Sequence, residues 1–159
     1  AWTYAGGVRD VGQVSLRRLV DRFRFRSITD STAVYGIVGR PVAHSVSPAM
    51  HNASFAAAGV DAVYLPLPAA DVDDFVAFAR AFGLRGASVT IPYKVALFEH
   101  VQEADDLTRR IGALNTLKID GDRWSARNTD VAGFLRPLRD RSVPVRGRRA
   151  AILGAGGSA

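Results

Sequence analysis

Apolar positions along the chain follow two alternating patterns. Short, mainly apolar runs are typical of strands buried on both faces, and they lie at residues 33–39, 62–67, 86–90 and 149–153. The segments between them carry apolar residues at helical spacing and predict helices that begin near Ser15, Ser47, Asp71 or Asp73, Leu97, and Thr129 or Asp130. Because strands alternate with helices, the sequence predicts an α/β domain with a mostly parallel sheet.

Caps and turns give some of the element boundaries. Ser47 is expected to be the N-cap of a helix that has Pro48 at its first position. A single helix is predicted over residues 97–111, because acidic residues stand early in it and arginines late. Segments 113–119 and 123–127 predict a hairpin around an Asp-Gly-Asp turn.

Length and composition describe one ordinary globular domain. The chain has 159 residues, of which 48% are hydrophobic and 23% charged, close to the average of soluble domains. No stretch approaches the roughly 18 consecutive apolar residues that a bilayer requires, so no membrane partner is expected. The absence of cysteine excludes a disulfide framework and a thiolate metal site and fits a reducing compartment. The first residues lack a secretory signal, so we expect a cytoplasmic protein.

The net charge of +6 raises the question of a nucleic-acid partner. The positive excess lies in two flanks, residues 1–28 and 135–149, whereas residues 29–134 hold more acidic than basic residues. No aromatic ladder or nucleic-acid motif accompanies the arginines. We therefore interpret the flanks as solvated helix and linker, and expect no nucleic-acid partner.

The last six residues satisfy the G-x-G-x-x-G/A pattern directly after an apolar run. In that context the glycines let the backbone turn tightly and approach a dinucleotide pyrophosphate. The simpler alternative is a glycine-rich turn. The sequence stops at the third position of the pattern, so the helix that would follow is not in it. The candidate cofactor-binding residues are Gly154, Ala155, Gly156, Gly157, Ser158 and Ala159.

Two serines flank the predicted start of the second helix. Free backbone N–H groups at a helix start, together with the hydroxyls of Ser45 and Ser47, form a cradle that suits a carboxylate or phosphate. The alternative is that Ser47 caps the helix and Ser45 is a loop residue. His44 and His51 lie seven residues apart with no carboxylate at matching spacing, so no metal site is expected there.

A lysine and an aspartate follow two predicted strands. Lys94 comes just after the strand at 86–90, and Asp130 follows the strand at 123–127; open α/β sheets bind ligands at such strand ends. A lysine amine can exchange a proton near neutral pH when it is desolvated, and a guanidinium cannot. Together the two side chains could handle the proton of a carbonyl reduction in which a nicotinamide supplies hydride. The alternatives are a solvated lysine and a helix N-cap.

Five motifs in order resemble the shikimate dehydrogenase family over residues 33–159: HSVSPAMHN, GASVTIPYK, GALNTL, ARNTDVAGF and GAGGSA. The resemblance implies a three-layer α/β substrate-binding domain with a mostly parallel sheet at 33–147, followed by the first strand of a truncated Rossmann domain at 148–159. It implies reduction of 3-dehydroshikimate to shikimate with NADPH, in the shikimate pathway to chorismate and the aromatic amino acids. The family usually has Asn where this chain has Ser88, a shorter side chain that retains a hydroxyl.

The resemblance also implies roles for the candidate residues. Lys94 and Asp130 would be the catalytic pair, and Ser45 and Ser47 would bind the substrate carboxylate. Contacts to the ring hydroxyls would come from Thr90, Asn115 and Asp130. The partner would be a small molecule, shikimate or 3-dehydroshikimate. The sequence carries no marker of oligomeric state.

Residues 1–28 resemble the end of a type I 3-dehydroquinate dehydratase barrel, because Gly12-Gln13-Val14-Ser15 precedes a short helix. This resemblance implies a bifunctional dehydratase–dehydrogenase. Two alternatives to shikimate dehydrogenase stay open: a quinate or quinate/shikimate dehydrogenase, and a non-catalytic ligand-binding module.

Overall fold

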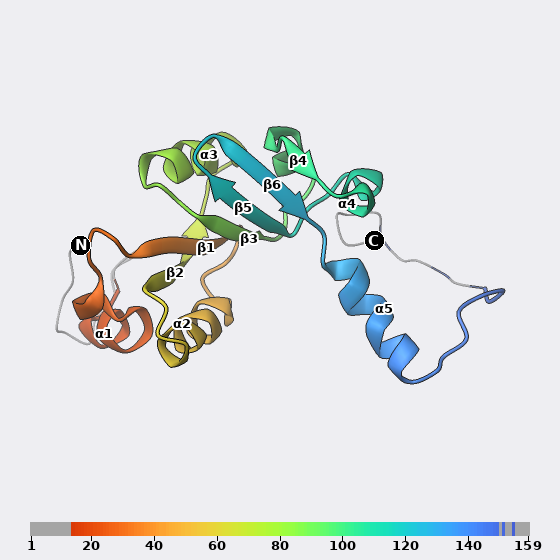
Figure 1. The fold of residues 1–159 in the computed structure, drawn as a ribbon, viewed down its shortest axis with the longest axis horizontal. Coiled ribbons are helices and arrows are strands. Elements are labelled where there is room, and N and C mark those ends of the chain that lie inside the picture. The colour runs from red at the N-terminus through yellow and green to blue at the C-terminus, as the bar shows by residue number, and fades with distance from the viewer. Residues whose placement is uncertain (1–13, 150, 152–153, 155–159) are drawn as a thin grey trace.

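The computed structural model describes residues 14–149, 151 and 154. Its one sheet has the strand order β2-β1-β3-β5-β6-β4 (Figure 1). The strands are β1 (Ala33–Gly39), β2 (Ala62–Pro68), β3 (Gly86–Val89), β4 (Glu103–Ala104), β5 (Thr116–Asp120) and β6 (Arg123–Arg127). The helices are α1 (Leu16–Phe23), α2 (Ser47–Ala57), α3 (Val72–Ala81), α4 (Asp106–Ile111) and α5 (Asp130–Asp140), with short 3₁₀ turns η1 (Phe25–Ser27) and η2 (Ala96–His100).

Strand directions decide which segments meet at the same edge of the sheet. β1 runs parallel to both β2 and β3, and β4 runs parallel to β6. β5 is antiparallel to β3 and to β6. The carboxyl ends of β1, β3 and β6 and the amino end of β5 therefore lie along one edge. The predicted α/β class and mostly parallel sheet are confirmed.

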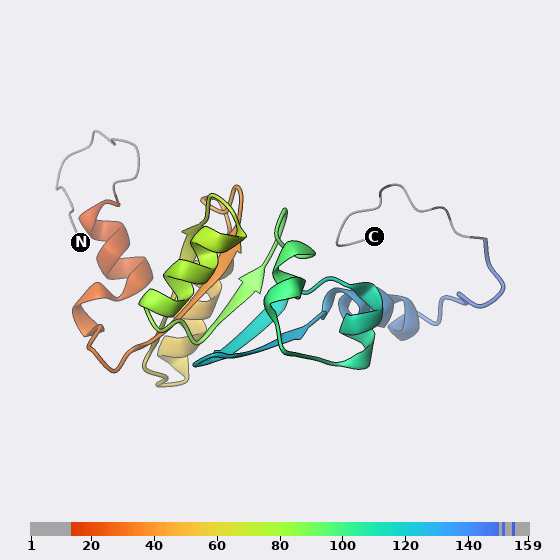
Figure 2. The ribbon, with the colours of Figure 1, turned by 90° about the horizontal axis from the view of Figure 1, so that it is seen from above.

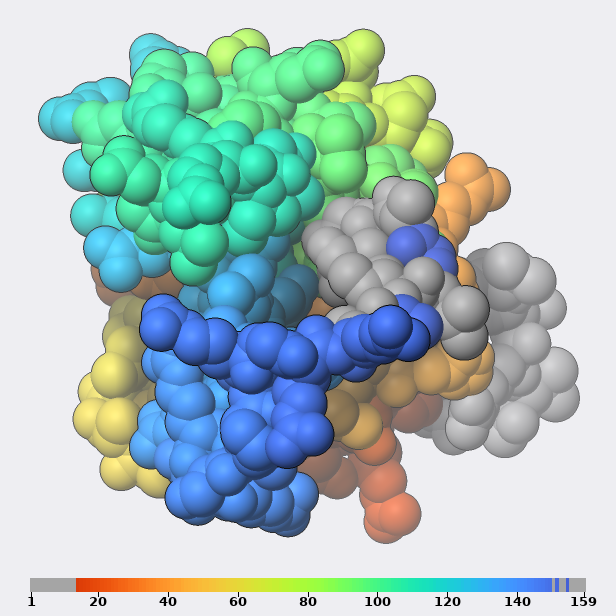
Figure 3. Space-filling view, turned by 90° about the vertical axis from the view of Figure 1, so that its right-hand side faces the viewer, coloured from red at the N-terminus to blue at the C-terminus, as the bar shows by residue number. Residues whose placement is uncertain are grey.

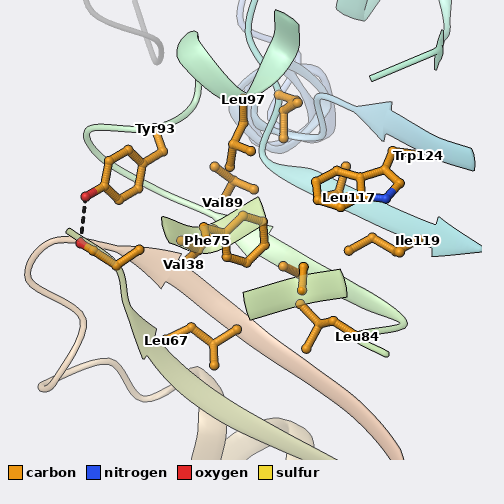
Figure 4. Close-up of a cluster of buried hydrophobic side chains, with 14 of the residues drawn as sticks. Val38, Leu67, Phe75, Leu84, Val89, Tyr93, Leu97, Leu117, Ile119 and Trp124 are labelled. Atoms are coloured by element: carbon orange, nitrogen blue, oxygen red, sulfur yellow. Dashed lines mark hydrogen bonds between the residues drawn. The ribbon is translucent and has the colours of Figure 1, made fainter. Parts of the chain in front are cut away.

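The larger core fills the face of the sheet that α3 and η2 cover (Figure 4). Phe75 and Leu84 are almost completely buried there, and the Phe75 ring meets the Trp124 ring edge-on at 6.2 Å. Tyr93 closes one end of this core, and its hydroxyl donates to the Ala69 carbonyl at 2.7 Å. Burying such side chains stabilises the fold by about 1.5–3 kcal/mol each. Residues of β3 and β5 both belong to this core, so its packing helps to hold the two strands together.

The opposite face is covered only in part (Figure 2). Helix α2 packs on β2, and α1 packs on α2. Ile37, Val42 and Tyr64 form a smaller core beneath α2. In the hairpin of β5 and β6, buried residues alternate with exposed or half-buried ones, because one face rests on the larger core and the other faces solvent.

Helix α5 extends away from the sheet (Figure 1). None of its residues is buried, and the Phe134 side chain is 72% exposed. When the right-hand side of Figure 1 faces the viewer, α5 and the segment after it lie below the elements between η2 and α4 (Figure 3). The helix predicted from Thr129 or Asp130 is confirmed. Few of the described residues pack against it.

Most predicted elements match, although several boundaries shift; the strand predicted at 86–90, for example, ends at Val89. The strand at 33–39 and the hairpin strand at 123–127 have the predicted bounds, and Ser15 and Asp71 cap their helices as expected. Ser47 is not the N-cap of α2; Val46 holds that position and Ser47 is the first helical residue. The strand expected from residue 113 begins at Thr116, because residues 113–115 form the loop that enters β5.

The single helix predicted over 97–111 is wrong. The chain there forms η2, then strand β4, then α4. The Asp105 side chain accepts from the Thr108 N–H at 2.8 Å and begins a new helix, and Gln102 pairs with the backbone of Trp124 in both directions. These hydrogen bonds attach the chain to β6, so the continuous helical spacing does not become one helix. The strand predicted at 149–153 lies largely outside the described residues.

Candidate active site

Four chain segments that carry candidate residues converge on one edge of the sheet. The loop with Ser45 and Ser47 follows β1, and Thr90 and Lys94 follow β3. Asn115 stands immediately before β5, and Asp130 begins α5 just after β6. The direction of these strands alone brings the four segments together, as expected for a ligand site in an open α/β sheet.

Lys94 and Asp130 form an ion pair. The Lys94 Nζ lies 2.7 Å from Asp130 Oδ2, and the two side chains are 14% and 38% exposed. The backbone of Lys94 is fixed as well, because its carbonyl accepts from the Leu114 N–H at 2.9 Å. A charge-assisted hydrogen bond of this length keeps the ammonium in one position. The N-cap alternative for Asp130 is wrong, since Thr129 holds that position and Asp130 is the first helical residue.

Asn115 connects this pair to the start of α5. Its amide nitrogen donates to Asp130 Oδ1 at 2.7 Å and to the Thr129 hydroxyl at 2.8 Å. Its amide oxygen accepts from the Thr129 N–H at 3.0 Å and from the Thr116 hydroxyl at 2.9 Å. Both oxygens of the Asp130 carboxylate therefore have a donor, one from Asn115 and one from Lys94.

Asn128 supports the site through hydrogen bonds to its backbone, and it was not singled out from the sequence. It is buried; its side chain donates to the Ala113 carbonyl and accepts from the Asp130 N–H, each at 3.0 Å. Its own N–H donates to the buried Thr108 hydroxyl at 2.8 Å. An Asn side chain often hydrogen-bonds the backbone two residues further on. The Asn in the motif ARNTD could therefore have been predicted to hold the N–H of Asp130. Thr116 carries no such signal, and Thr129 was predicted only as a possible start of the helix.

Ser45 and Ser47 lie together at the start of α2. The Ser45 hydroxyl accepts from the Ser47 N–H at 3.2 Å, so Ser45, and not Ser47, satisfies a backbone donor at this end. Both side chains are half-buried. The Ser47 hydroxyl stands at the first helical residue, where the positive end of the helix dipole favours an anion.

Thr90 links the loop after β1 to the loop after β3. The Thr90 N–H donates to the Val38 carbonyl and the Arg40 N–H donates to the Ile91 carbonyl, each at 2.9 Å. Gly39 makes this close approach possible, because an added Cβ would overlap the Thr90 side chain and lie 2.9 Å from the Ile91 oxygen. The structure thereby places Thr90 beside the loop that carries Ser45.

Of the six candidate cofactor-binding residues, only Gly154 lies among the described residues. It has a φ of +117° with open space around it, a backbone conformation that glycine adopts and other residues rarely do. Residues 155–159 lie outside the described part of the chain, as does Gln13.

The described residues offer neither a helix that could cross a membrane nor a cluster of metal-binding side chains. Within them, no helix combines the length and apolar character needed to cross a membrane. Within the same residues, no three His, Cys, Asp or Glu side chains are placed to hold a metal ion together.

Fold and site define an α/β ligand-binding domain with a lysine–aspartate pair and a serine-lined helix start at one sheet edge. The sequence profile of the family described as "Shikimate dehydrogenase substrate binding domain" matches residues 37–117. The chain belongs to this family.

Relatives agree with this assignment. The shikimate dehydrogenase (NADP(+)) of Symbiobacterium thermophilum is 47% identical over 128 residues, which are 79% of this chain and 44% of that protein. The crystal structure of shikimate 5-dehydrogenase from Listeria monocytogenes in complex with shikimate and NAD superposes with a TM-score of 0.70 at 34% identity, covering 82% of this chain and 46% of that one.

A quinate dehydrogenase has a similar fold. The structure of quinate dehydrogenase from Corynebacterium glutamicum in complex with NAD gives a TM-score of 0.63 at 30% identity, covering 69% of this chain and 42% of that one. The chain spans less than half the length of the curated relatives it matches.

Proposed function

We propose that this chain is the substrate-binding part of an NADP-dependent shikimate dehydrogenase, which reduces 3-dehydroshikimate to shikimate. The observation that carries the proposal is the Lys94–Asp130 ion pair of 2.7 Å at the edge where the strand ends meet. Relatives named shikimate dehydrogenase (NADP(+)) at 44–47% identity support the same reaction and cofactor. The reaction belongs to the shikimate pathway of aromatic amino acid biosynthesis.

The proposed chemistry adds a hydride to the carbonyl carbon and a proton to the carbonyl oxygen. Bound NADPH supplies the hydride. The Lys94 ammonium donates the proton to the oxygen as negative charge develops there, and the Asp130 carboxylate holds the ammonium in place through Oδ2. Because Asn115 donates to Oδ1, the carboxylate keeps one orientation, and the reacting groups start close to their productive geometry.

The proposed substrate contacts lie at the same edge of the sheet. Ser45 and Ser47 bind the substrate carboxylate at the start of α2, where the hydroxyls and the helix dipole favour an anion. Thr90, Asn115 and Asp130 contact the ring hydroxyls. The hydrogen bonds between the β1 and β3 loops support this arrangement, because they hold Thr90 beside the serine loop.

The residues that would hold NADP are Gly154, Ala155, Gly156, Gly157, Ser158 and Ala159. The positive φ of Gly154 supports this proposal. The glycines let the cofactor pyrophosphate approach the backbone. The proposed domain division is 33–147 for substrate and 148–159 for the beginning of the Rossmann domain.

A fusion to 3-dehydroquinate dehydratase is part of the proposal. Helix α1 precedes the region that the family profile matches, is capped by Ser15 and packs against α2 and β2. Residues 1–28 are proposed as the end of the dehydratase barrel, and the protein as cytoplasmic. A dehydratase assay on the gene product that contains this chain tests the fusion.

A quinate dehydrogenase is the second candidate, because one structural relative carries that name. The experiment is a pair of assays on the gene product: NADPH oxidation with 3-dehydroshikimate, and quinate oxidation with NAD and NADP. Rapid turnover in the first assay supports the proposal, and quinate turnover alone supports the second candidate. A ligand-binding module would bind shikimate in calorimetry and turn over neither substrate.

A further inference from the structure

A tyrosine–serine hydrogen bond lies on the α2 face of the sheet, beside the proposed active site. The Tyr64 hydroxyl of β2 donates to the Ser88 Oγ of β3 at 2.7 Å, crossing β1. Tyr64 is 4% exposed and Ser88 is half-buried. Tyr64 therefore has almost no surface for a ligand, whereas Ser88 does.

Tyr64 is fixed by two neighbouring residues of α2. The Asn52 side chain donates to the Tyr64 carbonyl at 2.9 Å and accepts from the Tyr64 N–H at 2.8 Å. The His51 ring stacks on the Tyr64 ring with centroids 4.3 Å apart. These residues end the motif HSVSPAMHN, and neither has a role in the proposed reaction. The Asn52 bonds hold the Tyr64 backbone, and the His51 ring packs on the phenol whose hydroxyl reaches Ser88.

Ser88 lines a cavity on the α2 face of the sheet, and Thr116, which also lines it, connects this cavity to the catalytic pair. The cavity has a volume of about 480 Å³, and its lining includes Tyr35, His51, Phe55, Tyr64, Ser88 and Thr116. Thr116 is the register partner of Ser88, and its hydroxyl donates to Asn115 Oδ1 at 2.9 Å. Since Asn115 in turn donates to Asp130, a continuous polar layer runs from Ser88 to the carboxylate.

The direction of the Tyr64–Ser88 bond determines what Ser88 offers a ligand. A serine hydroxyl has one proton to donate and two lone pairs that accept. The Tyr64 hydroxyl is the donor in this bond, and burial raises the pKa of the phenol above its ordinary value, so the phenol keeps the proton that it donates. Ser88 Oγ accepts this hydrogen bond, and among the described residues no group accepts a hydrogen bond from the Ser88 hydroxyl in return. The Ser88 hydroxyl is thus left as a donor toward the cavity.

We propose that Tyr64 is a positioning residue that fixes the Ser88 hydroxyl as a hydrogen-bond donor to a ring oxygen of the substrate. The pair would contribute to selection among hydroxylated ring acids, because a ring lacking an oxygen at that point would leave the donor unpaired. This inference rests on the proposed function.

The test is a double-mutant cycle on the gene product, with Tyr64→Phe, Ser88→Ala and both together. Tyr64→Phe keeps the buried ring, the His51 stacking and the Asn52 contacts and removes only the hydroxyl. We expect it to raise KM for 3-dehydroshikimate by roughly 3- to 10-fold, the range of one hydrogen bond, with kcat within about twofold. In the Ser88→Ala background the same substitution should change KM by less than about twofold.

Tyr93→Phe is the matched control, because Tyr93 is also buried and its hydroxyl also makes one hydrogen bond, to the Ala69 carbonyl. It should lower Tm and leave KM unchanged. Equal KM effects of Tyr64→Phe with and without the Ser88 hydroxyl would overturn the positioning role, as would an effect on Tm alone. A wild-type protein that does not reduce 3-dehydroshikimate would overturn the proposed function itself, whereas an active wild type with a neutral Tyr64→Phe overturns only this inference.

Discussion

The Lys94 Nζ and the Asp130 Oδ2 lie 2.7 Å apart although 36 residues separate them in sequence. The pair forms because β3 and β6 both point toward the same sheet edge, with β5 antiparallel between them. Ala113, Asn115 and Asn128 then hold the segments together by hydrogen bonds. Because the site depends on these supports, substitutions that do not touch the reacting groups should also change activity.

Asn115 is the first such support. Asn115→Ala removes the donor to Asp130 Oδ1 and the contacts to Thr129, so kcat should fall by roughly 10- to 100-fold, the cost of a misplaced catalytic group. Asn115→Asp should be worse, because it places a second carboxylate against Asp130. Steady-state kinetics of the gene product measure both. Equal kcat for Asn115→Asp and wild type would rule out the orienting role.

Asn128 supports the site through stability. Asn128→Ala breaks two side-chain hydrogen bonds and leaves the Ala113 carbonyl and the Asp130 N–H without their partner. We expect the free energy of unfolding of the 159-residue chain to fall by about 2–4 kcal/mol, since unmade buried hydrogen bonds are costly. Urea denaturation measures it. Ser54→Ala, which removes an exposed bond within α2, is the control and should change stability by less than about 0.5 kcal/mol; similar losses in both variants would contradict the account.

Gly39 tests the contact between the two loops. Gly39→Ala would press a Cβ against the Thr90 side chain and the Ile91 carbonyl, so we expect a loss of about 1–3 kcal/mol and weaker shikimate binding by calorimetry. Gly133→Ala is the matched control. Gly133 lies inside α5 with nothing near its Cβ position, and there alanine should raise stability by up to about 1 kcal/mol. A tolerated Gly39→Ala would mean that the loops do not need this close approach.

Alkaline pH should destabilise the chain through Tyr64. Burial raises the pKa of the Tyr64 phenol in the folded state above its ordinary value of 10.0, so the neutral form is favoured in the folded state. The stabilisation is present in full below about pH 10 and is lost as pH rises through the raised value. Between pH 8 and 11 the Tm of the wild type should fall more steeply than that of Tyr64→Phe. Parallel curves would contradict this, because they would show that the Tyr64 phenol has the same pKa in the folded and the unfolded state.

Sequence reasoning predicted the α/β class and the strands of the sheet core, because apolar runs and helical spacing report burial directly. It also placed Lys94 and Asp130 at strand ends. It missed the Tyr64–Ser88 bond and the Thr116–Asn115 bond, because these depend on register between strands that the sequence does not specify. Strand β4 has two residues, too few for a pattern, and the Asp105 cap inside an otherwise helical spacing made the prediction for 97–111 wrong.

The most direct test of the proposed catalytic role is the kcat of Lys94→Ala in the gene product that contains this chain. Loss of a positioned proton donor should lower kcat by about 10²- to 10⁴-fold, with KM for 3-dehydroshikimate changed by less than about threefold. Arg123→Ala is the control, since it breaks an exposed ion pair with Glu103 at the opposite end of β6. It should keep wild-type rates. An unchanged kcat in Lys94→Ala would contradict the assignment of the Lys94–Asp130 pair to proton transfer.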